Sequence, residues 1–361
     1  MAGNRKKILF LVEAMGGGVF TYMVDLANEL VKTYDMYIAY AVRSQTPANY
    51  REQFDPRIQL IEVEHFVRSI NPSKDIRAFF EIRKIADRVQ PDIIHLHSSK
   101  AGALGRWAFN GKRTPIFYTP HGYSFLMQNQ NAAKRLLYKS VEKISGKRRC
   151  TTISCSEGEH RESCRLTRHA AYVNNGINVD KLKNVLDSVA TQEQHPFTVF
   201  TLGRICYQKN PALFNKIALA MPDVHFVWIG DGEMRAELSA PNIEITGWAE
   251  RETALRYSMQ GDVFVLTSLW EGLPMSLLEA MYMRKLCIVS DVIGNRDVIH
   301  TGENGFVCRT AEEFVTAIRE AQNGDTQDMI ENAYTDILET YNTKAMAGHY
   351  SDIYREAMRS L

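Results

Sequence analysis

Apolar residues in this chain gather in short runs, and segments with helical spacing lie between them. In the first half, the runs predict strands near 7–12, 36–42, 58–62, 92–96, 115–119, 150–153 and 170–173. Helical patterns separate several of these strands, at 18–32, 73–89, 99–110, 132–145 and 156–166. Such alternation is typical of parallel sheets that are covered by helices on both faces.

The second half repeats the alternation. Its strands are predicted near 197–202, 224–229, 243–246, 262–267 and 286–290, with helices near 210–220, 232–239, 250–259 and 275–284. Residues 178–196 between the halves are polar and lose the strand rhythm, so we place a linker there. The tail, 311–361, reads as mostly helical with a turn-like break at 323–325.

These patterns predict an α/β protein with two Rossmann-like, doubly wound parallel-sheet domains, residues 1–180 and 196–344. Ligands of such sheets bind outside the carboxyl ends of the strands. We therefore expect the two domains to face a central cleft.

Composition agrees with a soluble globular protein, because 45% of the 361 residues are apolar and 24% are charged. No apolar run approaches the ~20 residues of a membrane span. The run at 8–12 is too short for a secretory signal and fits a first strand better. The six cysteines show neither metal spacing nor a disulfide-dense pattern, so we expect reduced thiols in the cytoplasm.

Charge is unevenly distributed along the chain. Residues 100–168 hold fourteen Lys and Arg against four Glu, which leaves a local net charge of +10 in a chain whose total is +1. Solvated helix faces would explain this, and so would a basic surface on anionic lipid at the inner face of the cell membrane. No nucleic-acid recognition module is visible, so we expect no nucleic-acid partner.

The segment from Glu271 to Glu279 carries the most specific signal. A buried-looking strand leads to Glu271, the turn Gly272-Leu273-Pro274 follows, and Pro274 suits the first turn of a helix. The unpaired N–H groups at that helix start would bind an anion. One carboxylate on each side of a phosphate matches the layout of a nucleotide-sugar, in which a diphosphate separates sugar hydroxyls from ribose hydroxyls.

Two other loops could approach a diphosphate. After the strand at 197–202, Arg204 and Lys209 could clamp it as a fork and a point charge, and so stabilise a leaving diphosphate. The chain has no Asp-x-Asp pair, so this chemistry calls for no metal. After the first strand, Gly17 and Gly18 would let the backbone approach a phosphate or sugar, although a tight turn would also explain them.

Two aromatic side chains complete the candidate set. His121 lies at a strand tip before Gly122, where it can meet a ligand hydroxyl, although lone histidines are usually structural. Trp248 could present its backbone or ring to a base, or could equally pack in the core. His97 lies at the end of another strand, and its role stays open.

Taken together, these motifs resemble family 4 of the retaining glycosyltransferases, which have the GT-B fold. The matching pieces run in the family's order over some 260 residues: Gly16-Gly17-Gly18-Val19, His121-Gly122, Asn175-Gly176-Ile177, Gly203-Arg204 with Lys209-Asn210, Gly230-Asp231-Gly232, and Glu271-Gly272-Leu273-Pro274 with Glu279. The glutamate pair with Gly-Leu-Pro is specific, whereas the glycine loop and His-Gly are weak signals alone.

The resemblance implies transfer of a hexose from a nucleotide-sugar to an acceptor hydroxyl, with retention and without a metal or other cofactor. UDP is expected from its prevalence in the family. The reaction would build a bacterial polysaccharide, capsule, lipopolysaccharide or glycolipid on a saccharide or lipid-linked saccharide acceptor. The family's last helix commonly crosses back to the first domain, and residues 345–361 would do so here.

The resemblance also assigns roles to residues. Arg204 and Lys209 would hold the diphosphate, Glu279 the ribose hydroxyls, and Glu271 and His121 the sugar, while Gly18 would approach the phosphate. Gly272, Leu273 and Pro274 would offer backbone groups. The leaving phosphate would accept the acceptor's proton, so Glu271 is not expected to be a nucleophile.

Two other functions remain open from the sequence. A nucleotide-sugar epimerase on the same fold would need acid and base groups at the sugar carbon, and no convincing second set is present. A non-catalytic partner subunit would not be expected to keep Arg204, Lys209, Glu271 and Glu279.

Overall fold

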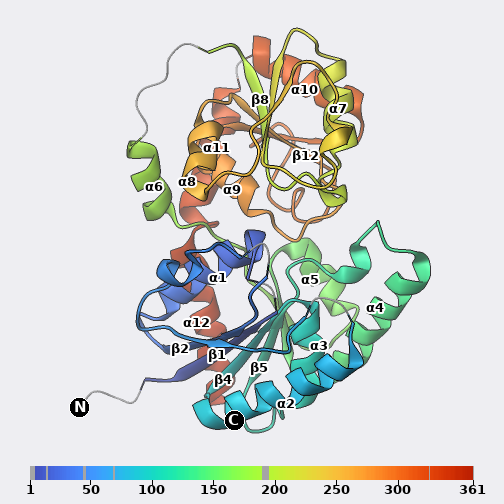
Figure 1. Ribbon diagram of the computed structural model, residues 1–361. Helices are drawn as coiled ribbons and strands as arrows, with labels where there is room; N and C mark the ends of the chain where they lie inside the picture. Colours follow the sequence, from blue (N-terminus) through green and yellow to red (C-terminus); the bar gives the residue numbers. More distant parts are fainter. Residues whose placement is uncertain are drawn as a thin grey trace. The chain divides into compact units, whose positions relative to one another are not determined.

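The computed structural model describes residues 5–13, 15–43, 46–67, 70–188, 195–324 and 326–360. The chain forms two compact units (Figure 1). Unit 1 comprises residues 1–126, 130–175 and 343–361, and unit 2 comprises residues 127–129 and 176–342. The main part of unit 1 thus ends at residue 175, whereas the sequence placed the domain end at residue 180. Residues 343–361 belong to unit 1 as well.

Unit 1 is built on a seven-stranded parallel sheet in the order β3-β2-β1-β4-β5-β6-β7. Its strands are β1 (Lys7–Val12), β2 (Asp35–Tyr40), β3 (Gln59–Glu62), β4 (Ile93–His97), β5 (Ile116–Thr119), β6 (Thr151–Ser154) and β7 (Ala170–Tyr172). Its helices are α1 (Gly17–Leu30), α2 (Pro72–Val89), α3 (Ser99–Ala108), α4 (Ala132–Ser145), α5 (Glu157–Cys164) and α12 (Thr343–Arg359). Short 3₁₀ turns lie at Tyr50–Gln53 and Ser124–Leu126.

Both faces of this sheet are buried, as the continuous apolar runs predicted. Ile8, Phe10 and Val12 of β1 belong to one cluster of buried apolar side chains, and Leu9 and Leu11 belong to another. Because successive side chains of a strand point to opposite faces, β1 contributes to a core on each side of the sheet.

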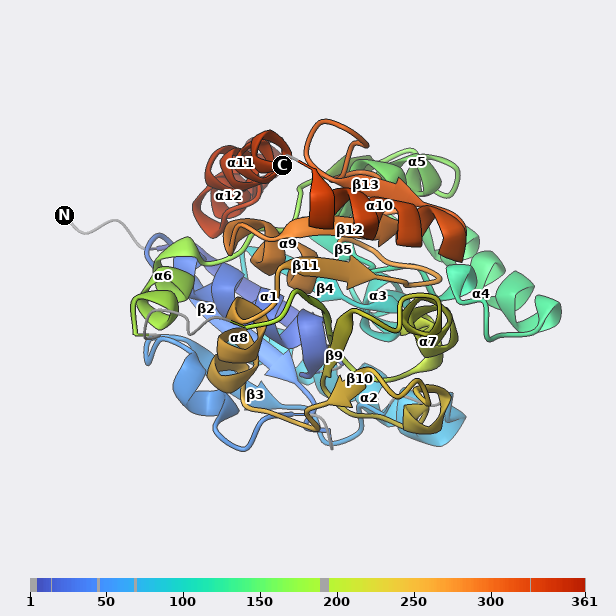
Figure 2. The same cartoon turned by 90° about the horizontal axis from the view of Figure 1, so that it is seen from above.

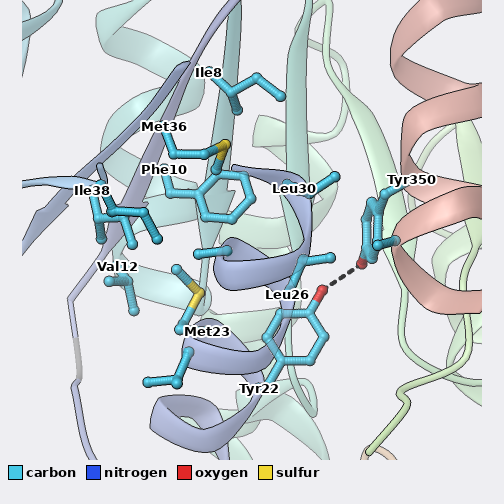
Figure 3. Close-up of a cluster of buried hydrophobic side chains, with 14 of the residues drawn as sticks. Ile8, Phe10, Val12, Tyr22, Met23, Leu26, Leu30, Met36, Ile38 and Tyr350 are labelled. Atoms are coloured by element: carbon cyan, nitrogen blue, oxygen red, sulfur yellow. Dashed lines mark hydrogen bonds between the residues drawn. The ribbon is translucent and has the colours of Figure 1, made fainter. Parts of the chain in front are cut away.

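Helix α12 belongs to unit 1 although it follows unit 2 in the chain. It packs on α1, and its Tyr350 and Tyr354 are fully buried. Figure 3 shows the Tyr22 hydroxyl of α1 donating a hydrogen bond of 2.7 Å to the Tyr350 hydroxyl beside the apolar cluster. The last helix therefore completes the core of the first unit.

Unit 2 has a six-stranded parallel sheet in the order β10-β9-β8-β11-β12-β13. Its strands are β8 (Thr198–Leu202), β9 (His225–Ile229), β10 (Ile243–Ile245), β11 (Val263–Leu266), β12 (Leu286–Ser290) and β13 (Phe306–Cys308). Its helices are α6 (Val179–Asp187), α7 (Pro211–Leu219), α8 (Arg251–Met259), α9 (Met275–Tyr282), α10 (Ala311–Asn323) and α11 (Gln327–Glu339), and 3₁₀ turns lie at Tyr207–Lys209 and Arg235–Glu237. Figure 2 shows α10 lying along β12 and β13.

The linker prediction for residues 178–196 was wrong in its first half. Residues 179–187 form α6, which Asn178 caps by accepting a hydrogen bond from the Lys181 amide, and Leu182 is fully buried. Helix α6 packs against α8, so an apolar helical face explains why this polar segment folds. The rest of the predicted linker includes residues 189–194, which lie outside the described residues.

The helix predicted at 232–239 was also wrong, because the segment forms a single 3₁₀ turn. Its backbone hydrogen-bonds the loop after β8 instead: the Met234 amide donates to the Ile205 carbonyl, and the Ile205 amide donates to the Asp231 carbonyl. A third difference is β13, a three-residue strand that the sequence pattern did not reveal.

Candidate functional site

The topology of each sheet defines a switch point, where the strand order reverses direction. In unit 1 it lies between β1 and β4, and in unit 2 between β8 and β11. Loops that leave the carboxyl ends of such neighbouring strands diverge to opposite faces, and ligands of doubly wound sheets bind in the crevice between them. The candidate residues of each unit can be compared with these two places.

In unit 2, the loops after β8 and β11 are joined by an ion pair. The Lys209 ammonium lies 2.7 Å from Oε1 of Glu271, and both side chains are largely buried. The Ser268 hydroxyl donates to the same carboxylate oxygen at 2.7 Å, and the Gln208 amide donates to Oε2 at 3.3 Å. Both oxygens of Glu271 are therefore occupied, and the carboxylate fixes the Lys209 ammonium at the switch point.

The backbone of the two loops is joined as well. The Thr267 hydroxyl donates to the Lys209 carbonyl at 2.7 Å, and the Leu269 amide donates to the Gln208 carbonyl at 2.8 Å. Asn210 has a left-handed conformation (φ 52°) and caps α7 by accepting from the Leu213 amide, which turns the chain directly after Lys209. The position of Lys209 is thus set by several independent contacts.

Arg204 lies in the same loop but pairs with Glu233, its Nε donating to the carboxylate at 3.0 Å. Both side chains are well exposed. Gly203 lies between Arg204 and β8, and a Cβ there would lie 3.4 Å from the Lys209 side chain. Gly230 has a positive φ of 138°, and the backbone of the β8 loop occupies the place where a Cβ would lie. This position is therefore specific for glycine.

The turn at Gly272-Leu273-Pro274 leads into α9, but Pro274 is the N-cap and not a residue of the first helical turn. The prediction for Pro274 was therefore one position off. Gly294 packs against the backbone of Gly272 and Leu273, leaving no room for a Cβ, and it has a positive φ of 86°. Gly294, which follows β12, thus packs against the backbone of the turn. This role could not be expected from the sequence.

Glu279 lies in the second turn of α9 and is almost fully buried. Its carboxylate accepts a hydrogen bond from the guanidinium of Arg251, at the start of α8. Sequence reasoning missed Arg251 as a partner of Glu279. Trp248, three residues earlier, is 67% exposed, so the core-packing alternative for its ring was wrong.

In unit 1, the glycine loop follows β1. Gly16 is the N-cap of α1, and Gly17 has a positive φ of 58° with nothing within 4 Å of its Cβ position. The first turn of α1 holds no acidic residue. Gly17 and Gly18 therefore belong to a helix start with exposed backbone whose dipole favours an anion.

His121 lies two residues after β5 in a left-handed conformation (φ 55°), beside two other histidines. Its Nε2 lies 3.1 Å from Nδ1 of His97, whose ring stacks on it, and the Tyr22 ring contacts it edge-on. Burial lowers the pKa of His121 to about 3 and holds that of His97 well below its usual range. Both rings are neutral at physiological pH, so His121 can share hydrogen bonds without carrying charge.

A buried carboxylate fixes the turn at His121. Glu159 of α5 accepts from the Gly122 amide at 2.7 Å and from the Cys155 amide at 2.9 Å. Sequence reasoning missed Glu159, which is one of four glutamates in the basic stretch 100–168 and looked like part of a helix surface. Its contact with Gly122 is what distinguishes it.

The structure therefore brings Lys209, Glu271 and the Gly272–Pro274 turn together in unit 2, with Arg204 in the same loop as Lys209. Glu279 lies one turn into the helix that this turn begins. His121, Gly17 and Gly18 lie in unit 1 at the ends of β5 and β1. No group of three or more metal-binding side chains occurs in the part of the chain that the structure describes.

Two doubly wound domains with charged and glycine-rich loops at their switch points define an α/β protein of the nucleotide-binding type. Residues 16–181 match the model of glycosyltransferase family 4, and residues 196–323 match that of the glycosyl transferases of group 1. The chain belongs to the group 1 glycosyltransferases, and its two parallel-sheet domains have the GT-B fold.

Several relatives of known activity are bacterial transferases. The chain is 28% identical over 334 residues to UDP-Gal:α-D-GlcNAc-diphosphoundecaprenol α-1,3-galactosyltransferase of Escherichia coli, covering 84% of this chain and 85% of the relative. It is 20% identical to N,N'-diacetylbacillosaminyl-diphospho-undecaprenol α-1,3-N-acetylgalactosaminyltransferase of Campylobacter jejuni, covering 98% of this chain and 100% of the relative. Both are transferases, so they favour neither an epimerase nor a non-catalytic subunit.

Solved structures share the fold at low identity. Sucrose-phosphate synthase from Thermosynechococcus elongatus has a TM-score of 0.83 at 16% identity, covering 99% of this chain and all of that one. Anabaena HepE in complex with UDP-glucose has a TM-score of 0.74 at 17% identity, covering 98% of this chain and all of that one. Among the described residues of the present chain, no helix has the length and apolar character needed to span a bilayer.

Proposed function

We propose that this glycosyltransferase moves a hexose from a UDP-sugar to a hydroxyl of a lipid-linked saccharide, in the assembly of a bacterial polysaccharide. The single observation that carries the donor site is the Lys209–Glu271 pair at the switch point of unit 2. The relatives named for UDP-sugars and diphosphoundecaprenol-linked acceptors support the substrate classes.

In this proposal, Lys209 and Arg204 bind the donor's diphosphate. Lys209 is already held in place, so little side-chain freedom is lost on binding. The Arg204–Glu233 pair is exposed, and exchanging an exposed partner for a diphosphate costs little free energy. Glu279, with Arg251 holding its carboxylate in position, would accept hydrogen bonds from the ribose hydroxyls.

The reaction proceeds with retention and needs no metal ion. The bond between the anomeric carbon and the diphosphate oxygen breaks, and the acceptor oxygen bonds to the same face of that carbon. The acceptor's proton passes to the leaving diphosphate, whose developing charge Lys209 and Arg204 stabilise. Glu271 is not the nucleophile, because Lys209, Ser268 and Gln208 occupy its oxygens. Neutral His121 would orient a sugar hydroxyl.

The test is a panel of nucleotide-sugars with a diphosphoundecaprenol-linked saccharide, scored by release of nucleoside diphosphate and by the anomeric proton coupling of the product. We expect one UDP-sugar to react, with the donor's anomeric configuration kept and with turnover unchanged in EDTA. Absence of turnover with every donor, together with no binding of UDP, would refute the proposal. Inversion would refute the mechanism alone, and loss of activity in EDTA that Mg²⁺ restores would refute metal independence alone.

A further inference from the structure

Helix α4 exposes a row of apolar side chains to solvent. Leu136, Leu137, Val141 and Ile144 all project outward, and Leu136 and Ile144 are 67% and 54% exposed. Leu137, Val141 and Ile144 follow the spacing i, i+4, i+7, which places them along one side of a helix. The buried side of α4 instead carries Glu142 and Ser145, so the apolar row is not the side that faces the sheet.

The charged side chains that this segment exposes are all basic. Residues 131–149, all of them described, contain seven exposed cations: Lys134, Arg135, Lys139, Lys143, Lys147, Arg148 and Arg149. The one acid in this stretch, Glu142, is buried, and it pairs with Arg106 at 2.7 Å and accepts from the Tyr118 hydroxyl at 2.9 Å. No carboxylate in this segment therefore offsets the positive charge facing solvent.

A tryptophan lies beside the carboxyl end of the helix. Trp107 of α3 is half exposed, and its indole N–H donates to the Ser145 hydroxyl at 3.1 Å. The Arg148 guanidinium lies over its ring, 4.9 Å from the centroid. Tryptophan is favoured at membrane–water interfaces, where its ring meets an apolar phase and its polar edge stays hydrated.

This combination differs from ordinary surface leucines. Leu219 and Leu338 of unit 2 are about as exposed as Leu137, but each stands alone at the end of its helix, which needs no explanation. On α4, four neighbouring apolar side chains interrupt a basic surface. An apolar row with cations along its border is the pattern of a helix that lies in a bilayer interface.

We propose that α4, with Trp107, docks on the surface of an anionic lipid bilayer. The apolar row enters the boundary between headgroups and acyl chains, and Lys139 and Lys143 contact anionic headgroups. A second copy of the chain is a poorer occupant, because a twofold interface on this face would bring like charges together. Nucleic acid would leave the exposed apolar row unused. This docking goes beyond the donor site and does not depend on it.

The experiment is co-sedimentation of the full chain with vesicles of equal parts phosphatidylcholine and phosphatidylglycerol, compared with pure phosphatidylcholine. We expect binding to the anionic vesicles that weakens as salt increases. The double variant Leu137→Ser/Ile144→Ser should lower the partition coefficient at least tenfold, since each leucine-sized side chain contributes ~1.5 kcal/mol or more when buried. Lys139→Gln/Lys143→Gln should lower it ~30-fold, at ~1 kcal/mol per cation, and should weaken the salt dependence.

Matched controls come from unit 2. Leu219→Ser/Leu338→Ser and Lys183→Gln/Lys216→Gln change equally exposed side chains and should bind vesicles like the parent. UDP binding and melting temperature in solution should be the same in all variants, which shows that they are folded. Equal binding to neutral vesicles, loss of binding in the control variants, or unchanged binding in both α4 variants would overturn the proposal. So would a parent dimer that the α4 variants convert to monomer.

Discussion

The buried histidines of unit 1 make its stability depend on pH in the mildly acidic range. His95 and His97 are buried in β4, and the half-buried His121 follows β5; desolvation lowers the pKa of each, that of His121 to about 3. His95 is held by the Tyr354 hydroxyl at 2.5 Å and the Thr119 hydroxyl at 2.9 Å. Folding therefore excludes protons that these rings would bind in the unfolded chain.

The sign and size of the effect follow from linkage. Because the folded pKa lies below the unfolded value of 6.5, the stabilisation is complete above that value and is lost as pH falls. Between about pH 7 and pH 5.5, each histidine removes ~1.3 kcal/mol from the free energy of unfolding, and the three together remove ~4 kcal/mol. Glu159, the nearest carboxylate to this loop, has a raised pKa from burial and acts in the opposite sense.

The variant His121→Asn isolates one of the three contributions. Asparagine tolerates the left-handed backbone at this position and does not titrate. The variant should lose ~1.3 kcal/mol less than the parent over the same pH interval. The control Thr119→Val removes a hydrogen bond from His95 without removing a proton site, so it should shift stability equally at both pH values.

The assay is urea unfolding at the two pH values, followed by pulsed hydrogen exchange in peptides from β1 and β4, which report on unit 1 alone. Equal pH dependence in the parent and in His121→Asn would refute the reasoning. It would mean that the His121 ring is protonated in the folded protein or reaches water.

Three further outcomes follow from single contacts. Lys209→Ala should lower kcat/KM for transfer by ~100-fold or more, since it removes a cation from the leaving diphosphate; a loss below tenfold in steady-state kinetics would contradict the role given to the Lys209–Glu271 pair. Arg106→Leu should cost ~3–5 kcal/mol in urea unfolding because Glu142 is left buried, and adding Glu142→Leu should restore most of it; no recovery would mean that packing dominates. Gly230→Ala should lower the melting temperature of unit 2, as its φ is 138° and backbone occupies the Cβ position; an unchanged melting temperature would show that the loop can move.

Strands were predictable because their signal is local. The apolar runs of β1 and β12 agree with the observed bounds, since a strand buried on both faces must be apolar along its length. Helix α6 was missed because its residues are mostly polar, and polarity was taken as loop character. The spacing of Val179, Leu182 and Leu186 held the helical signal.

The candidate site divides in the same way. Lys209 and Glu271 could be placed from sequence, because both lie in loops that follow apolar runs, and the carboxyl ends of neighbouring parallel strands lie at one sheet edge. Arg251, Gly294 and Glu159 could not, because each acts on a residue distant in the chain: Arg251 on Glu279, Gly294 on the turn at Gly272 and Glu159 on Gly122. The residues next to Arg251, Gly294 and Glu159 in the chain give no signal that identifies these distant contacts.

Helix α12 has a consequence for how the protein is made. Its Tyr350 and Tyr354 fill the core of unit 1, yet they leave the ribosome only after all of unit 2 has been synthesised. During translation, unit 1 therefore stays incompletely folded, with Tyr22 and the neighbouring apolar side chains uncovered. Until α12 emerges, this uncovered apolar surface makes the nascent chain prone to aggregation.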